Sequence, residues 1–263
     1  MFSVPPCPGV SFGCIDTINR LSIQLLSLDA GGVLVFPNFE RISDTFARHG
    51  IAVSPDALRD ADPHGRFAVD TADRVARTSD ADRGSMYFRI MFARAGVPPD
   101  APIQDALAEL WAYHTEHNLW EYVPPGVSAA LERLAARVPL AIGSNANGII
   151  HRVFERTGLS RFFSVICDSH VEGVEKPHRR FFEILVARAG GRPETTLHVG
   201  DLYHVDIVGA RAAGLQAMLF DPHDLYGAYD VQRVRTLDEV AAFVTGRNHE
   251  EREDSKLTKK QTS

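Results

Sequence analysis

The sequence predicts an α/β fold, a doubly wound parallel sheet with a helical segment inserted after its first strand. Short apolar runs that end in polar residues are typical of strands buried on both faces, and amphipathic helical stretches separate these runs. The interval 36–138 departs from this rhythm, because it lies between the first run and the second and has a mostly helical pattern. We therefore expect a parallel sheet covered by helices and a helical insert.

Five short apolar runs are the candidate strands. They occupy residues 23–29, 140–145, 165–168, 197–201 and 217–221. Alternation of such strands with helices predicts right-handed crossover connections, and hence a Rossmann-like sheet.

Four amphipathic stretches of this part of the chain are candidate helices. Each places large apolar residues three or four positions apart, so that they share one helix face. Glycines after the last periodic residue mark several of the ends. The stretches are residues 127–138, 148–157, 178–189 and 205–213.

The strand pattern divides the chain into a core and an insert. We expect the core to comprise residues 23–37 and 124–246, and the helical insert to comprise residues 38–123 and to lie over one edge of the sheet. Within the insert, residues 84–95 and 103–113 are amphipathic helix candidates.

The two ends of the chain have a different composition. Residues 1–22 contain several prolines and glycines without a clear period, and lack the cationic start of a signal peptide. Residues 247–263 are almost wholly polar and charged, so they cannot bury enough apolar surface to offset the loss of chain entropy. We expect a flexible N-terminal extension and a disordered tail.

Composition excludes several classes of protein. The 263 residues are 44% hydrophobic and 24% charged, with a net charge of −6, so there is no basic field for nucleic acid. No apolar run reaches the roughly 18 residues of a membrane-spanning helix. The three cysteines lack a C-x-x-C spacing, which argues against disulfides and structural zinc and favours a reducing compartment. We expect a cytoplasmic monomer or homodimer without a nucleic-acid or membrane partner.

Polar residues at the predicted strand ends form a candidate site. Asp29 follows the first strand, Ser144 and Asn145 the second, and Asp201 the fourth, while Lys176 lies in a loop before a helix. Ligands bind at the carboxyl ends of the strands of open α/β sheets. A carboxylate nucleophile, polar donors, one cation and metal-binding carboxylates are suited to attack on a phosphoryl centre with Mg²⁺.

Lys176 has a particular claim to function. The other three lysines, Lys256, Lys259 and Lys260, all lie in the polar tail, whereas the chain contains 24 arginines. A single lysine kept in the folded part indicates a requirement for a compact ammonium group at that position.

Four segments resemble the motifs of one known family, in order. LSLDAGGVL, LAIGSNANG, GVEKPHRRFF and HVGDLYHVDIVGARAAG are similar to the four motifs of the haloacid dehalogenase-like (HAD) hydrolase superfamily, subfamily I, over residues 23–221. The insert lies where that family places a helical C1 cap. The resemblance implies a Mg²⁺-dependent phosphohydrolase that acts on a small phosphorylated metabolite.

The resemblance also assigns roles to individual residues. It implies that Asp29 is the nucleophile that forms an aspartyl-phosphate, and that Ser144, with Asn145, and Lys176 hold the transferring group. It implies that Asp29 and Asp201 ligate Mg²⁺, with Asp206 as an auxiliary ligand.

Gly31 departs from the family pattern, since phosphatases of this superfamily usually have a second aspartate there, two residues after the nucleophile. The Gly31 carbonyl can still ligate Mg²⁺, but general acid–base catalysis, typically worth roughly 10²- to 10⁴-fold in rate, is lost from this position. We therefore expect a slow enzyme or one that favours good leaving groups. His49, His64 and Glu121 are candidates to supply the missing acid.

Two alternatives remain. An L-2-haloacid dehalogenase also lacks the second aspartate, but it has no use for the metal-type motif around Asp201. A catalytically silent domain that binds a ligand or partner is the other alternative, and only Gly31 favours it. Phosphonoacetaldehyde hydrolase chemistry is excluded, because it needs a cap lysine and the insert contains none.

Aromatic residues and histidines of the insert admit a simpler interpretation. The spacing of His114 and His117 fits no metal site. We expect these two histidines to contribute to cap surface and packing, and Tyr87, Phe88 and Phe92 to form cap core.

Overall fold

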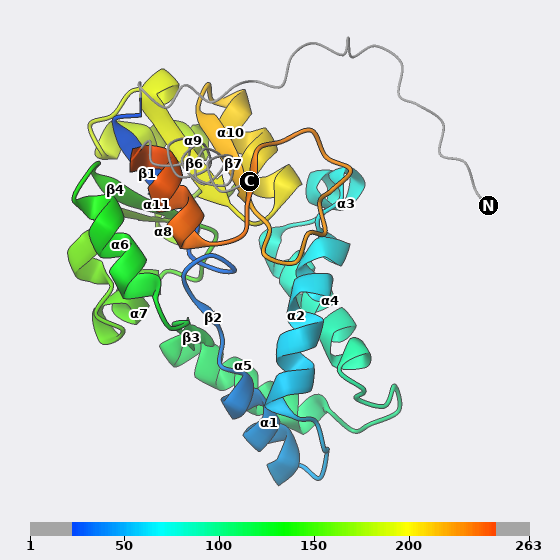
Figure 1. Cartoon of the computed structure of the whole chain (residues 1–263). Coiled ribbons are helices and arrows are strands. Elements are labelled where there is room, and N and C mark those ends of the chain that lie inside the picture. The colour runs from blue at the N-terminus through cyan, green and yellow to red at the C-terminus, as the bar shows by residue number, and fades with distance from the viewer. Residues whose placement is uncertain (1–22, 246–263) are drawn as a thin grey trace, which may run out of the picture.

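The computed structural model describes residues 23–245, and the sheet at its centre has six parallel strands in the order β5–β4–β1–β6–β7–β8. The chain proceeds from β1 to β4 and β5 on one side, then crosses to β6, β7 and β8 on the other (Figure 1). This is the predicted doubly wound α/β fold. The strands are β1 (Leu25–Leu28), β4 (Leu140–Ser144), β5 (Val165–Asp168), β6 (Thr196–Gly200), β7 (Gln216–Phe220) and β8 (Arg233–Val234). The expected extension 1–22 and tail 247–263 lie outside the described residues.

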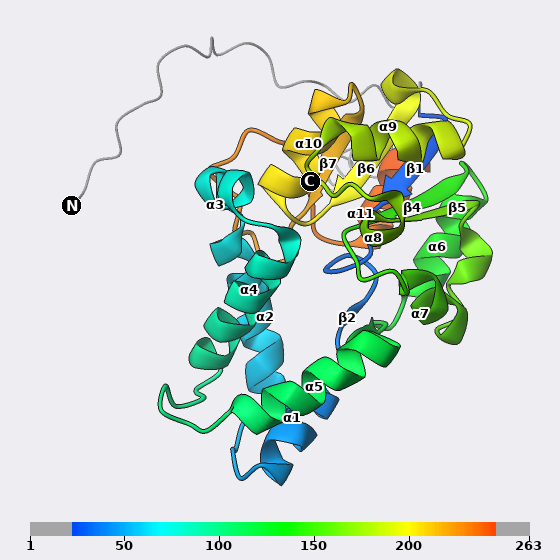
Figure 2. The same ribbon diagram turned by 180° about the vertical axis from the view of Figure 1, so that it is seen from behind.

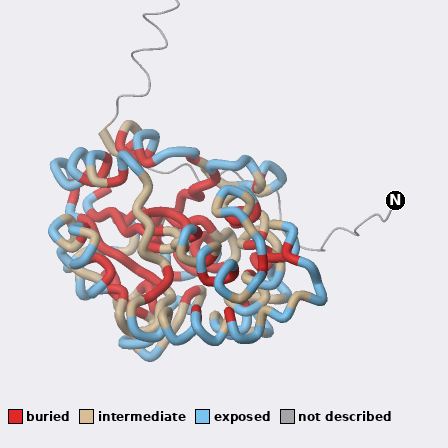
Figure 3. The backbone as a smooth tube through the Cα atoms, turned by 90° about the horizontal axis from the view of Figure 1, so that it is seen from below, coloured by how far each residue is buried: buried red, intermediate tan, exposed pale blue. Residues whose placement is uncertain are grey.

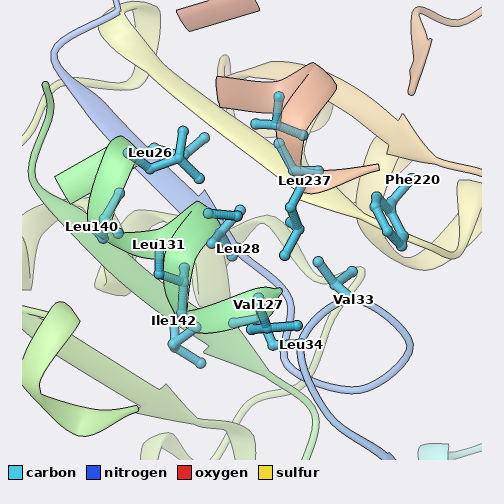
Figure 4. Close-up of a cluster of buried hydrophobic side chains, with 14 of the residues drawn as sticks. Leu26, Leu28, Val33, Leu34, Val127, Leu131, Leu140, Ile142, Phe220 and Leu237 are labelled. Carbon is cyan, nitrogen blue, oxygen red and sulfur yellow. The ribbon is translucent and has the colours of Figure 1, made fainter. Parts of the chain in front are cut away.

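Helices cover both faces of the sheet, which explains why the strands are continuous apolar runs. On one face Leu26 and Leu28 pack with Leu131 and Leu237 from two helices (Figure 4). On the other face, Leu25 packs in a second cluster. The first face is covered by α6 (Val127–Ala135), α7 (Ile150–Arg156) and α11 (Leu237–Thr245), and the second by α9 (Arg179–Arg188) and α10 (Val208–Ala212). Figure 3 shows buried backbone at the centre and exposed backbone around it.

The insert after β1 is a helical cap with its own hydrophobic core. It is entered and left through a short antiparallel pair, β2 (Phe36–Pro37) and β3 (Trp120–Tyr122). Its helices are α1 (Phe39–Arg48), α2 (Pro55–Val69), α3 (Ala72–Arg77), α4 (Asp80–Arg94) and α5 (Gln104–His117). Helices α2 and α4 lie side by side in both views (Figures 1 and 2). Phe39, Phe46, Met91 and Phe92 are fully buried within this cap.

The cap is joined to the core at the end of α2. Asp70, the C-cap residue of α2, accepts hydrogen bonds from the backbone N–H groups of Tyr203 (2.6 Å) and His204 (2.9 Å) and from the hydroxyl of Tyr226 (2.8 Å). Burial outweighs these hydrogen bonds and raises the pKa of Asp70 to about 7. One cap carboxylate thereby holds two separate segments of the core.

Several elements differ from the sequence prediction. The predicted helix 205–213 begins as a π-helix, η4 (Tyr203–Ile207), before it continues as α10. The insert lies over the carboxyl-terminal edge of the sheet, since strand-end and cap residues line one shared cavity. Elements without a prediction are β2, β3, β8, α11, α8 (Ser169–Glu172) and the 3₁₀ turns η2 (Ser160–Phe162) and η3 (Pro193–Thr195). No helix in residues 23–245 is long and apolar enough to cross a membrane.

Candidate active site

Three buried carboxylates meet at the carboxyl ends of the central strands. Asp29 follows β1, Asp201 follows β6, and Asp206 lies in η4. One carboxylate oxygen of each lies within 4.8 Å of the others. Burial raises the pKa of Asp29 to about 8 and that of Asp201 to about 6, and repulsion from Asp206 adds to both shifts. Asp29 and Asp201 therefore hold their protons more tightly than an exposed aspartate does.

Lys176 lies inside this cluster. Its side chain is 1% exposed, and its Nζ lies 2.9 Å from Asp29 Oδ1 and 2.6 Å from Asp206 Oδ1. Burial opposes the charged form, but the two carboxylates outweigh it and raise the pKa of Lys176. Lys176 is thus a permanent ammonium group beside Asp29.

Both oxygens of Asp206 have partners in the protein. Oδ1 bonds to Lys176 and lies 3.2 Å from His198 Nε2, and Oδ2 accepts a hydrogen bond from the Leu202 N–H at 3.0 Å. Although burial opposes ionisation, Lys176 and His198 lower the pKa of Asp206. This carboxylate therefore anchors Lys176.

The two oxygens of Asp29 have different surroundings. Oδ1 accepts a hydrogen bond from the Ala30 N–H at 2.7 Å and forms the ion pair with Lys176. Oδ2 has no hydrogen-bond partner among the described residues, and Asp29 lines the cavity. The arrangement leaves one carboxylate oxygen available to attack a ligand or bind a metal ion.

Asn145 and Ser144 occupy the end of β4. The Asn145 side chain bonds to the backbone of Lys176, with its Oδ1 accepting from N–H at 2.8 Å and its Nδ2 donating to the carbonyl at 3.0 Å. Asn145 Nδ2 also donates to Asp80 Oδ1 of the cap at 3.1 Å. Asn145 thus positions the Lys176 loop, while both Asn145 and Ser144 line the cavity.

Gly31 and Gly32, which follow Asp29 in the chain, occupy positions with different steric requirements. Gly32 has a φ of +77°, and a Cβ there would lie 2.3 Å from Asp201 Oδ2, so a side chain cannot fit. Gly31 has an ordinary φ, and a Cβ there would lie 3.4 Å from Cδ1 and Nε1 of Trp120. Backbone geometry therefore requires glycine at position 32 and not at position 31.

The donor set fits a divalent cation. The three clustered carboxylates are hard oxygen ligands of the kind that Mg²⁺ prefers, and Gly31 also lines the cavity. A bound cation would relieve the repulsion among the three carboxylates, which contributes to the raised pKa values of Asp29 and Asp201. Asp29 and Asp201 are better placed than Asp206 to hold a metal ion, because Lys176, His198 and the Leu202 N–H already occupy Asp206.

The cap contributes Arg66, which the sequence analysis did not single out. Arg66 Nη1 forms an ion pair with Asp201 Oδ2, and its Nη2 contacts Asp62 Oδ2 at 2.8 Å. The Tyr87 hydroxyl donates to Asp62 Oδ1 at 2.7 Å. In the sequence, the four-residue spacing of Asp62 and Arg66 on α2 indicates an ion pair. Such pairs are common on helix surfaces, so the spacing alone does not identify a site residue.

A cavity of about 710 Å³ lies between the carboxylates and the cap. Tyr87 and Phe92 lie in the cap core with Phe88 packed against them, as expected, and Tyr87, Phe88 and His114 also line the cavity. Trp120, which the sequence analysis also missed, lines the cavity beside Gly31. None of the proposed substitute acids, His49, His64 and Glu121, is among the lining residues.

His114 is held by contacts within the protein at the cavity wall. Its Nδ1 accepts a hydrogen bond from the Leu119 N–H at 3.1 Å, and burial lowers its pKa. Its Nε2 lies 3.4 Å from Asn147 Nδ2, so both ring nitrogens have partners in the protein.

Comparison with known proteins agrees with this geometry. Residues 23–214 match the model of the haloacid dehalogenase-like hydrolases. The chain is 34% identical over 122 residues to the ribulose-1,5-bisphosphate 5-phosphatase of Halopiger xanaduensis, a match that covers 46% of this chain and about half, 51%, of that relative.

Solved structures with low sequence identity share the fold. A HAD-hydrolase, YfnB, from Bacillus subtilis bound to magnesium superposes with a TM-score of 0.61 at 18% identity, covering 84% of this chain and 98% of its own. The L-2-haloacid dehalogenase of Xanthobacter autotrophicus superposes with a TM-score of 0.53 at 17% identity, covering 85% and 99%. The family match, the inserted cap and the strand-end aspartates lead to one conclusion: the chain belongs to the haloacid dehalogenase-like hydrolases.

Proposed function

We propose that this protein is a Mg²⁺-dependent phosphohydrolase that acts on a small phosphorylated metabolite through a phosphoryl-enzyme on Asp29. The observation that carries the proposal is the placement of Lys176 Nζ, 2.9 Å from Asp29 Oδ1, inside a cluster of three carboxylates. A nucleophile beside a fixed cation, with hard oxygen ligands for a divalent ion, is suited to a reaction in which negative charge gathers on phosphoryl oxygens. The phosphatase activity of the relative from Halopiger xanaduensis supports the same reaction class.

In the first step Asp29 Oδ2 attacks phosphorus in line with the leaving group. The P–O bond to the leaving group breaks as the new bond to Asp29 forms, and the leaving group takes the electron pair. Lys176 and the hydroxyl of Ser144 lie on the cavity wall to hold phosphoryl oxygens. Mg²⁺, when held by Asp29, Asp201 and the Gly31 carbonyl, supplies positive charge against the phosphoryl oxygens.

In the second step water attacks the phosphorus of the aspartyl-phosphate. The bond from phosphorus to Asp29 breaks, the water proton passes to solvent, and inorganic phosphate leaves. Because position 31 is glycine, no carboxylate there protonates the leaving group or activates this water. We therefore propose an enzyme that is slow or favours leaving groups stable as anions.

Two variants test this proposal together with metal removal. Hydrolysis of p-nitrophenyl phosphate and acetyl phosphate should require Mg²⁺, stop with EDTA, and be lost in Asp29→Asn. Asp221→Asn is the matched control, because Asp221 is also a buried aspartate after a sheet strand, β7, and does not line the cavity. That variant should keep its activity.

Other outcomes would identify the alternatives. Release of chloride from 2-chloropropionate without phosphatase activity would make the protein a dehalogenase. Absence of both activities in a folded protein would leave the silent, ligand-binding domain.

A further inference from the structure

We propose that the substrate is an aryl phosphate monoester, with the aromatic leaving group held against Trp120 and its bridging oxygen facing the Trp120 indole N–H. This inference rests on the proposed function and names its substrate class. Four features of the cavity support it, namely its size, its aromatic wall, the donor beside Gly31 and the distribution of charge.

The cavity is much larger than a phosphoryl group requires. Its volume of about 710 Å³ lies within the range of about 300–1,000 Å³ that is typical of sites for drug-sized ligands. Residues of the core, Asp29 and Lys176 among them, and residues of the cap line it together. The space beyond the phosphoryl group is therefore available to the leaving group.

Aromatic rings form the wall next to this space. Trp120 makes edge-to-face contacts with Phe88, with ring centroids 5.6 Å apart, and with His114, 5.7 Å apart. Its backbone is fixed as well, because its N–H donates to Asn118 Oδ1 at 2.9 Å. Two ring contacts and a backbone hydrogen bond restrict this side chain, so it contacts a ligand at little entropic cost, and flat aromatic groups bind to such rings by offset stacking.

The indole of Trp120 lies beside Gly31, the position at which phosphatases of this superfamily usually have an aspartate. An added Cβ at Gly31 would lie 3.4 Å from Trp120 Nε1, so the indole borders the place of the missing side chain. Trp120 Nε1 has no hydrogen-bond partner among residues 23–245, and it is not a fully buried atom. An indole nitrogen can only donate, so it stabilises an oxyanion without giving up its proton.

This donor suits a phenolate better than an alkoxide. As Asp29 Oδ2 bonds to phosphorus, the bond from phosphorus to the aryl oxygen breaks and the electron pair passes to that oxygen. The phenolate leaves with a hydrogen bond from Trp120 and takes its proton from solvent. An alkoxide needs a full proton transfer, which neither Gly31 nor Trp120 supplies.

The charge of the cavity excludes a second phosphate on the leaving group. Each lysine and arginine that lines the cavity is already paired: Lys176 with Asp29 and Asp206, Arg66 with Asp62 and Asp201, and Arg83 with Asp80. Asp80 and Glu175 add negative charge to the wall between cap and core. A leaving group without further negative charge fits this wall, and a sugar bisphosphate does not.

Binding of two non-hydrolysable ligands tests the aromatic preference directly. Phenylphosphonate and cyclohexylphosphonate have similar size and the same charge, but only one has a flat π-face. With wild-type protein and Mg²⁺, calorimetry should show phenylphosphonate binding roughly tenfold more tightly. Equal affinities, or no binding of either compound, would overturn the inference.

Kinetics of Trp120→Phe test the donor. This variant keeps a ring but removes the N–H, and should lower kcat for phenyl phosphate by roughly 10²-fold with little change in KM. The loss of kcat should be smaller for p-nitrophenyl phosphate, because its leaving group concentrates less charge on oxygen. A purely structural role of Trp120 would not produce this difference between the two substrates. Tyr113→Phe is the matched control. It also removes a hydrogen-bond donor from an aromatic residue of the cap, but Tyr113 does not line the cavity. An equal loss on both substrates would contradict the role of the indole.

The outcomes separate this inference from the proposed function. Hydrolysis of acetyl phosphate with no preference for phenylphosphonate would leave the phosphohydrolase intact and overturn the substrate class. No hydrolysis of any phosphate, with a clear preference for phenylphosphonate, would overturn the phosphohydrolase and leave an aryl-anion binding site.

Discussion

Arg66 of the cap helix α2 forms an ion pair with Asp201 of the core, so that one guanidinium bridges the cap and the carboxylate cluster. The same guanidinium is held by Asp62, which in turn accepts a hydrogen bond from Tyr87. The position of the cap is thus linked electrostatically to a carboxylate that is placed to bind a metal ion.

Replacement of Arg66 should strengthen metal binding. In Arg66→Gln the Asp201 carboxylate loses a competing cation, so the Kd for Mg²⁺ should fall by roughly tenfold, about 1.4 kcal/mol. Isothermal titration calorimetry measures this without reference to activity. Arg59→Gln is the control, because Arg59 lies on the same helix and pairs with Glu40 and Asp56 at the surface. An unchanged or weaker affinity in Arg66→Gln would show that the two cations do not compete.

Removal of the Lys176 charge should affect both activity and stability. Lys176→Met leaves Asp29 and Asp206 buried without their cation, so activity should fall by at least roughly 10²-fold and the free energy of unfolding by roughly 3–5 kcal/mol. Urea denaturation measures the second quantity. Arg179→Met breaks an exposed ion pair with Glu183 and should cost less than about 1 kcal/mol.

A second substitution separates the two effects of Lys176. Asp206→Asn added to Lys176→Met removes one of the unpaired charges, so it should recover part of the stability and none of the activity. Full activity of Lys176→Met would refute the role of the ammonium group.

The metal-free protein should become less stable as pH rises from 6.5 to 8.5. Asp29 and Asp70 have pKa values of about 8 and about 7 in the folded state, against 3.8 for an ordinary aspartate. The folded state therefore binds protons that the unfolded state has released, and this contribution to stability is lost as pH rises through the folded-state pKa values. The melting temperature in EDTA should decline across this window.

Two comparisons identify the source of that decline. Asp29→Asn should show a shallower slope, and Mg²⁺ should raise the melting temperature more at pH 8.5 than at pH 6.5, because a cation favours the ionised carboxylates. A melting temperature in EDTA that rises over this range would contradict the assignment.

Asp70 should stabilise the contact between the cap and the core. Asp70→Ala leaves the Tyr203 and His204 N–H groups and the Tyr226 hydroxyl without their acceptor, which should lower the free energy of unfolding by roughly 2–4 kcal/mol. Hydrogen exchange should quicken in η4. Asp73→Ala, which breaks an exposed pair with Arg77 on α3, should leave exchange in η4 unchanged. Equal rates of hydrogen exchange in η4 in the two variants would show that Asp70 does not stabilise the contact between cap and core.

The sheet and the carboxylate cluster were predictable because they depend on local patterns. Continuous apolar runs identify buried strands, and the residue after each such strand lies at one edge of the sheet, so Asp29 and Asp201 could be placed together before any coordinates. Lys176 was identifiable for a different reason, since it is the sole lysine outside the polar tail. Its burial between two carboxylates agrees with that inference.

The cap side of the site was not predictable in the same way. Trp120 and Arg66 lie 89 and 35 residues after Gly31, and no local period shows that both approach its loop. Their positions depend on how the cap packs over the sheet, which is set by contacts distant in sequence. The role of Asn145 was also hidden, because a strand-end amide has the same sequence context whether it binds a ligand or, as here, the backbone of Lys176.

The central claim is that Asp29 is phosphorylated during turnover. The most direct measurement is mass spectrometry of the intact protein and its peptides after acid quenching of a reaction with acetyl phosphate and Mg²⁺. We predict one added phosphoryl group on the peptide that contains Asp29, absent in Asp29→Asn and absent with EDTA. Turnover without a phosphoryl group on that peptide, or with one on another residue, would contradict the account.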